Sequence, residues 1–158
     1  MAALAPKDNS VDDSEKKVLS DIEKYGCHVV HVLEEKDSPR FTYSVGIQQT
    51  TNQPELLITG LRRELAHSII NNYNQRIKAG ELFLTERMYP GFIEGFDVVF
   101  KVVSEQKYRE YLGWAIWFYK GSYFSAYQLI FPSTSGKWPW DLDAPYDYTW
   151  FIPSLYES

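Results

Sequence analysis

The apolar residues of this chain come in short segments, and most of these segments end at a glycine or a proline. The longest strongly apolar run is about eight residues, far below the roughly 20 that a helix needs to cross a bilayer. With 158 residues, 44% of them apolar, the chain can still bury a sizeable core. We therefore expect a single globular domain at residues 10–158, preceded by a flexible leader at residues 1–9.

Three segments show apolar residues repeated every three or four positions, which predicts amphipathic helices at residues 10–26, 61–80 and 104–121. Ser10 is expected to cap the first helix, and Tyr25 is expected on its apolar face. Each of the three segments ends at a glycine, the residue that most readily adopts the left-handed conformation found after a helix.

Five other segments are rich in β-branched and aromatic residues and read as strands: residues 27–33, 41–47, 56–59, 96–103 and 124–131. The second of them alternates strictly between apolar and small polar residues. The links between the first three strands are short, as in hairpins. We expect an α+β fold with a mainly antiparallel sheet of about five strands packed with three helices, and with the aromatic C-terminal segment wrapped over the core.

The C-terminal segment, residues 132–158, combines prolines with many aromatic residues, namely Trp138, Trp140, Tyr146, Tyr148, Trp150, Phe151 and Tyr156. Its prolines exclude a regular helix. One interpretation is a tail wrapped over the sheet with its rings buried. The other is an aromatic surface that binds a partner, because Trp and Tyr dominate binding hot spots.

The net charge of −5 is concentrated at the two ends of the sequence. An acidic chain lacks the electrostatic attraction that phosphate-backbone binding needs, so we expect no nucleic-acid partner and no membrane partner. Acidic residues lie between the C-terminal aromatic residues, which favours a basic protein as the partner. A single cysteine, Cys27, excludes an intramolecular disulfide and is consistent with a cytoplasmic location.

Signatures of catalysis are missing from the sequence. No phosphate-binding loop, dinucleotide fingerprint or nucleophile elbow is present. His28 and His31 are three residues apart on a predicted strand and so face opposite ways, which argues against a metal site. Cys27 reads as a small core thiol. Glu55 follows Pro54 at a strand entrance, where it either caps backbone N–H groups or binds a polar ligand.

Several motifs, in this order and spacing, resemble the bacterial domain-of-unknown-function family 4262 (DUF4262): Gly26-Cys27-His28-Val29, Phe41-Thr42-Tyr43-Ser44-Val45-Gly46-Ile47, Pro54-Glu55-Leu56, Gly60-Leu61, Gln128-Leu129-Ile130-Phe131-Pro132 and Trp138-Pro139-Trp140. The chain departs from the family pattern at two positions. Gln53 stands where the family often has a histidine, and Cys27 where it often has an aromatic residue. The resemblance implies a shared fold and carries no established activity.

The candidate pocket or interface combines these motifs with the acidic C-terminal segment, and its residues are Tyr43, Ser44, Gly46, Glu55, Gly60, Gln128, Trp138, Trp140, Asp141 and Asp143. Our leading hypothesis is a non-enzymatic cytoplasmic binding domain that needs no cofactor. It would act like a bacterial immunity protein, which neutralises a basic toxin by occluding its active site. The alternative is an enzyme or small-ligand binder, with a flavin or nucleotide base stacked on Trp138 or Trp140 beside Tyr43 and Glu55.

Overall fold

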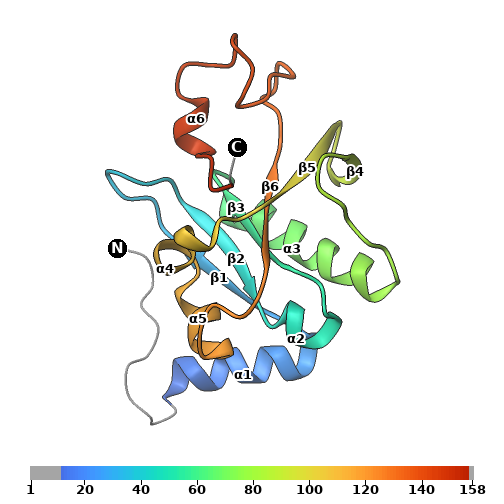
Figure 1. The fold of residues 1–158 in the computed structure, drawn as a ribbon, viewed down its shortest axis with the longest axis vertical. Coiled ribbons are helices and arrows are strands. Elements are labelled where there is room, and N and C mark those ends of the chain that lie inside the picture. Colours follow the sequence, from blue (N-terminus) through green and yellow to red (C-terminus); the bar gives the residue numbers. More distant parts are fainter. Residues whose placement is uncertain (1–11, 157–158) are drawn as a thin grey trace.

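A computed structural model describes residues 12–156 and shows one six-stranded sheet in the order β1-β2-β3-β6-β5-β4 (Figure 1). The strands are β1 (His28–Val32), β2 (Phe41–Val45), β3 (Glu55–Thr59), β4 (Met88–Ile93), β5 (Phe96–Val102) and β6 (Ala126–Ile130). The β3–β6 pair is parallel and every other pair is antiparallel. The sheet is therefore mixed.

Helices cover both faces of this sheet, and their bounds are α1 (Asp13–Tyr25), α2 (Ile47–Thr51), α3 (Arg63–Lys78), the 3-10 helix η1 (Glu105–Lys107), α4 (Tyr108–Tyr111), α5 (Gly113–Tyr119) and α6 (Tyr148–Phe151). The buried residues of α1, α4 and α5 share one core with Tyr43 and Leu57. Those of α3 share a second core with Leu56 and Ile58. Adjacent residues of β3 thus enter opposite cores, as the alternation of a strand requires. No helix within residues 12–156 is long and apolar enough to cross a membrane.

The predicted α+β class is confirmed, whereas the predicted sheet differs in two respects. The observed sheet has six strands. It is also mixed, because β3 and β6 run parallel after a long connection through α3, β4 and β5. The missed strand, β4, contains Pro90 and Gly91, which read as breakers in the sequence. A register shift between Tyr89 and Ile93 accommodates both residues at the sheet edge, where a lost hydrogen bond is tolerated.

The helices differ from the predictions at several points. The helix expected at residues 104–121 is divided, because Leu112 leaves helical geometry between α4 and α5. α2 and α6 are short helices of five and four residues that the sequence analysis did not predict. Tyr25, expected on the apolar face of the first helix, is exposed.

The N-terminus of α1 is capped by Asp12. Its side chain accepts from the backbone N–H of Glu15, whose carboxylate accepts from the Asp12 N–H in return. This capping box satisfies two N–H groups at the helix end. Ser10, the cap expected from the sequence, and the leader at residues 1–9 lie outside the described residues.

Gly46 joins β2 to α2 in the left-handed conformation, with φ of 103°. A Cβ atom at this position would lie 2.7 Å from Cγ1 of Ile22, a buried residue of α1. The position therefore requires glycine twice, for its backbone conformation and for the close approach of a helix. Gly95 has a similar φ of 84°, but a Cβ atom there would meet nothing within 4 Å.

We predict that Gly46→Ala lowers the free energy of unfolding by about 2–4 kcal/mol, because a left-handed alanine and a clash with Ile22 both cost stability. The matched change Gly95→Ala should cost only about 1 kcal/mol, because only the left-handed backbone conformation opposes an alanine there and no neighbour clashes with its Cβ atom. Urea unfolding of both variants measures the difference. Equal losses would show that α1 does not press on Gly46.

Candidate functional site

Glu55, the first residue of β3, is fully buried and accepts hydrogen bonds from three successive backbone N–H groups. Its carboxylate oxygens lie 3.0 Å from the N–H nitrogen of Gly46, 3.1 Å from that of Ile47 and 3.1 Å from that of Gln48. These groups open α2, whose first N–H groups have no partner within the helix. Gly46 at the N-cap position has no side chain to accept from them, so the Glu55 carboxylate serves as the cap of α2.

Two hydroxyl groups complete the surroundings of the Glu55 carboxylate. The Ser44 hydroxyl donates to Oε1 at 2.7 Å, and its own oxygen accepts from the N–H of Leu56. The Tyr119 hydroxyl donates to Oε2 at 2.5 Å and accepts from the N–H of Gln49. Tyr119 belongs to α5, so the carboxylate joins β2, β3, α2 and α5.

Burial raises the pKa of the Glu55 carboxyl, and the hydrogen bonds from Tyr119, Ser44 and the backbone oppose that rise. Burial and the adjacent Glu55 charge also raise the pKa of the Tyr119 hydroxyl, which stays protonated as the donor. All five of these hydrogen bonds end on Glu55 oxygens. The carboxylate is thus occupied by the chain itself and serves as an internal cap.

The strand, turn and Pro-Glu-Leu motifs that resemble DUF4262 meet at this carboxylate, and the family model for DUF4262, a domain of unknown function, matches residues 21–145. The chain belongs to the DUF4262 family. No curated protein and no solved structure matches it.

Apart from Tyr43 and Gln128, the predicted site residues of this DUF4262 domain fall at two opposite ends of the sheet. Ser44, Gly46 and Glu55 lie together where β2 ends and β3 begins. Gly60 follows the other end of β3, and Trp138 follows the corresponding end of the parallel strand β6. Figure 1 shows the C-terminal segment at the end of the sheet opposite α1 and α2. The structure does not bring Glu55 and Trp138 together.

Tyr43 and Gln128 are used inside the fold. The Tyr43 hydroxyl accepts from the N–H of Trp114, and the Tyr43 side chain is buried in the core that includes α1 and α5. The Gln128 amide donates to the carbonyl of Pro153 and accepts from the N–H of Leu155. Gln128 therefore fastens the C-terminal segment to the middle of the sheet.

Gly60 also serves the C-terminal segment. Its φ is 81°, and a Cβ atom there would lie 2.6 Å from the carbonyl oxygen of Phe151. The close backbone approach that the sequence suggested for a ligand is made by the chain's own tail. Ile152 and Leu155 are the buried anchors of that tail, and both are aliphatic.

None of the seven aromatic rings of the C-terminal segment is fully buried: three are exposed and four are half-buried, which corrects the interpretation of a tail with buried rings. Trp140 is 46% exposed and Tyr146 is fully exposed. Trp138 and Trp140 stack on one another with their centroids 5.2 Å apart. Asp141 accepts from the N–H of Trp138, so the acidic residue holds the turn that carries the two indoles.

Asp143 forms an ion pair with Lys137, with 2.7 Å between Oδ2 and Nζ. Lys101 of β5 lies 5.2 Å from the Trp140 ring, in a cation–π contact. Both contacts are local to the C-terminal end of the sheet. They give the aromatic and acidic segment a defined shape.

Three histidines gather at the free edge of β1, a grouping that the sequence analysis did not predict. His28 and His31 contact helices on opposite faces, as expected: Nδ1 of His28 lies 2.8 Å from Asp21 of α1, and Nε2 of His31 lies 3.0 Å from Nδ1 of His67 in α3. The strand edge nevertheless gives both residues access to one cavity of about 590 Å³. The only indication of this histidine grouping in the sequence was the polar face of the helix that is α3 in the structure.

Cys27 borders the same cavity and is buried. Burial, and next the negative charge of Glu55, raise the pKa of its thiol to about 12. A thiol with this pKa is protonated at neutral pH and is no nucleophile. Within the described range, no group of three or more His, Cys, Asp or Glu side chains could hold a metal ion.

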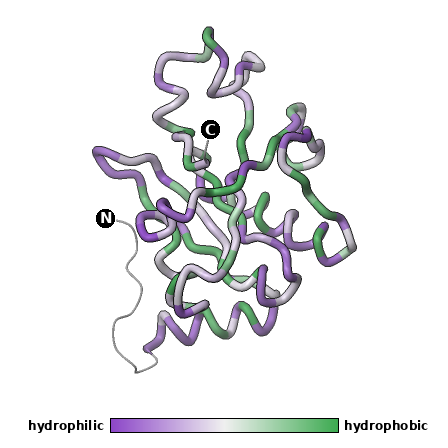
Figure 2. The backbone as a smooth tube through the Cα atoms, in the orientation of Figure 1, coloured by the Kyte–Doolittle hydropathy of each residue, from purple (hydrophilic) through white to green (hydrophobic). Residues whose placement is uncertain are grey.

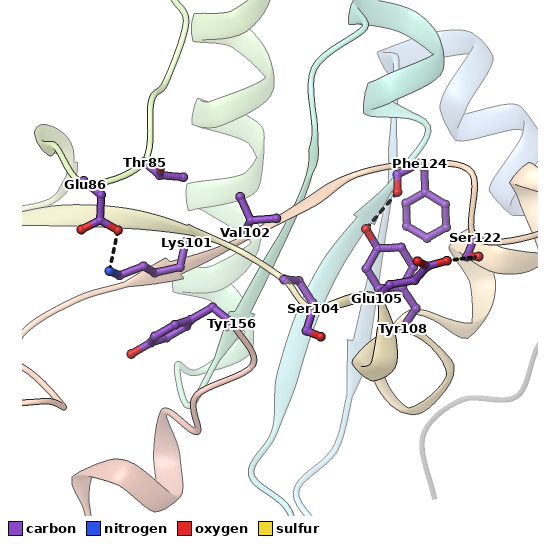
Figure 3. A pocket seen from close by; sticks show the side chains of 11 residues that line it. Thr85, Glu86, Lys101, Val102, Ser104, Glu105, Tyr108, Ser122, Phe124 and Tyr156 are labelled. Atoms are coloured by element: carbon purple, nitrogen blue, oxygen red, sulfur yellow. Dashed lines mark hydrogen bonds and ion pairs between the residues drawn. The ribbon is translucent and has the colours of Figure 1, made fainter. Parts of the chain in front are cut away.

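A second cavity, of about 440 Å³, lies beside the end of β5 and is shown in Figure 3. Its polar side chains satisfy one another. Lys101 pairs with Glu86 at 2.7 Å, and Glu105 accepts from the Ser122 hydroxyl at 2.7 Å (Figure 3). Lys101, the one basic side chain among the residues lining this cavity, is therefore already paired with a carboxylate.

We predict that Glu55→Gln lowers the free energy of unfolding by about 2 kcal/mol or more, because an amide NH₂ would face backbone N–H donors and leave them unsatisfied. Urea unfolding of the parent and the variant measures this change. A variant as stable as the parent would contradict the capping role of Glu55.

Stability should also depend on pH through His31. Burial, and next the positive charge of Arg63, lower the pKa of its imidazole to about 4 from the ordinary 6.5. Between these two values the unfolded chain binds the proton and the folded chain does not, so stability falls as the pH drops from 6.5 towards 4.

We therefore predict that His31→Gln loses less stability than the parent between pH 7 and pH 5, since glutamine takes up no proton. Urea unfolding at the two pH values measures both losses. Equal losses in parent and variant would show that His31 is not held neutral in the fold.

Proposed function

We propose that this DUF4262 domain is a non-enzymatic, cytoplasmic protein-binding domain that recognises a basic protein through its C-terminal aromatic and acidic segment, residues 138–150. The observation that carries the proposal is the exposure of large apolar side chains there. Trp140, Leu142, Tyr146 and Trp150 are all exposed within one short stretch of chain. Clustered exposed apolar side chains mark interaction surfaces, whereas single ones are ordinary.

The charge of the segment indicates the kind of partner. Asp141, Asp143 and Asp147 interleave with the aromatic residues, and Lys137 is the only basic residue beside them. In Figure 2 this loop is mostly hydrophilic to neutral on the hydropathy scale, with a short hydrophobic stretch at its tip. A basic surface complements this pattern, and charge complementarity speeds association and selects partners.

The chain on either side of the segment is fastened to the sheet. Just after it, Gln128 binds the backbone of Pro153 and Leu155, and Gly60 admits the Phe151 backbone at close range. The Tyr148 hydroxyl donates to the carbonyl of Phe131 at 2.6 Å. A surface that is ordered before binding loses less conformational entropy when the partner arrives.

The specific form of the proposal is an immunity protein, which covers the active site of a basic toxin. Size, acidity and an exposed aromatic surface support it. The small-ligand alternative needs Tyr43, Glu55 and Trp138 in one pocket, and Glu55 and Trp138 lie at opposite ends of the sheet. We therefore place protein binding first.

We predict that Tyr146→Ala weakens the complex with a cognate basic toxin domain by about tenfold, as expected for an aromatic hot spot. The matched control is Tyr123→Ala, because Tyr123 is equally exposed but lies in the turn before β6. It should change the affinity by less than about twofold.

Isothermal titration calorimetry measures both affinities, and survival of cells that express the toxin measures neutralisation. Absence of a complex at micromolar concentration would contradict the immunity proposal. A complex weakened by Tyr123→Ala and untouched by Tyr146→Ala would place the interface elsewhere.

A further inference from the structure

The strand β1 forms a free edge of the sheet. It pairs with β2 on one side, and on its other side no strand of residues 12–156 lies beside it. In an antiparallel edge strand, alternate residues turn their backbone N–H and C=O groups away from the sheet. Within residues 12–156, no other backbone or side chain bonds these outward groups of β1.

The two edges of the sheet differ in how they are protected. The β4 edge carries Pro90, Gly91 and a register shift, three devices that prevent another strand from pairing there. The β1 edge has none of them, and all five of its residues, His28–Val32, pair in an unbroken register with β2. The β1 edge is thus regular and ready to accept a further strand.

Three hollows of about 590, 470 and 330 Å³ lie along this edge. His31 and Arg63 border all three, so we treat the hollows together as one groove. The four consecutive residues 28–31 all border the second hollow. Because successive side chains of a strand point to opposite faces, four in a row can border one hollow only along the strand edge. The backbone of β1 is therefore the floor of the groove.

Two helices form the walls of the groove. α1 contributes Lys17, Asp21 and Tyr25, and α3 contributes Arg63, His67, Asn71 and Gln75. The α3 positions are four apart, so they form one stripe along the helix. From Arg63 to Gln75 this stripe is about 18 Å long, which matches about five residues of extended chain.

Four of the six acidic and basic side chains that border these hollows pair with one another, whereas Asp13 and Arg63 form no ion pair with another described residue. Lys17 pairs with Asp21 at 3.0 Å, and Arg40 lies 3.9 Å from Glu34. Arg63 is exposed, borders all three hollows and forms no ion pair with another described residue. Arginine binds carboxylates through two parallel hydrogen bonds, so an acidic group is its natural partner here.

We propose that the β1 edge, between α1 and α3, binds an extended peptide segment of a partner protein and that an acidic side chain of this segment pairs with Arg63. The peptide adds a seventh strand to the sheet, with its backbone on β1 and its side chains against the two helices. Both helices border the floor, so the groove admits a single strand more readily than the edge of a second folded domain. The site is separate from the C-terminal surface and does not depend on it.

The test begins with a library of random heptapeptides displayed on phage and selected on the full-length chain. Enriched peptides are synthesised with a fluorescent label, and their dissociation constants are measured by fluorescence anisotropy. We expect enriched peptides that carry Asp or Glu and lack proline at their centre. Failure to enrich any peptide would overturn the proposal.

Two variants of α3 locate the binding site. Asn71→Trp fills the groove from an exposed position on its wall, and Ser68→Trp places the same side chain on an exposed position that does not border the hollows. We expect the first to weaken binding at least about tenfold and the second less than about twofold. Thermal unfolding checks that both variants fold, and equal affinities would overturn the groove assignment.

Two neighbouring arginines test the acidic contact. Arg63→Glu should weaken binding of the acidic peptides at least about tenfold, whereas Arg62→Glu, at an exposed position outside the hollows, should change it less than about threefold. Peptide binding should also slow amide hydrogen exchange in residues 28–32, which side-chain contact alone would not do. Unchanged exchange there would overturn strand addition, and Tyr146→Ala should leave peptide binding intact.

Discussion

A single buried carboxylate joins four elements of this fold: β2, β3, α2 and α5. Glu55 starts β3, yet it accepts from the N–H groups that open α2, from Ser44 of β2 and from Tyr119 of α5. A buried carboxylate is costly unless its oxygens are saturated, and these oxygens are. Removing one donor would leave a charge short of partners, so the turn at Gly46 and the position of α5 both depend on Glu55.

The sequence predicted the regular elements well and their assembly less well. Apolar periodicity predicted α1, α3 and most strands, because an element that buries one face has apolar residues repeated at the period of a helix or a strand. It did not predict the parallel β3–β6 pair, since pairing between strands separated by a long connection leaves no local pattern. It also missed β4, because Pro90 is tolerated at a sheet edge for reasons that only the assembled sheet reveals.

The candidate site shows the same division. The motifs near Glu55 were recognised as a unit, and they do converge. Their link to Trp138 was wrong, because parallel pairing of β3 with β6 sends the C-terminal segment to the far end of the sheet. The sequence did not predict the groove at the β1 edge, because His31, His67 and Arg63 come together only when α3 packs across β1. The domain is thus an internally capped scaffold, and the two surfaces that we propose for partners lie apart on it.

The most direct test of this account is amide hydrogen exchange, measured by NMR, at Gly46, Ile47 and Gln48. If the Glu55 carboxylate caps α2 as described, these three amides exchange only when the whole domain unfolds, with the free energy found by urea unfolding. If they exchange freely, like the start of an uncapped short helix, Glu55 does not organise the fold.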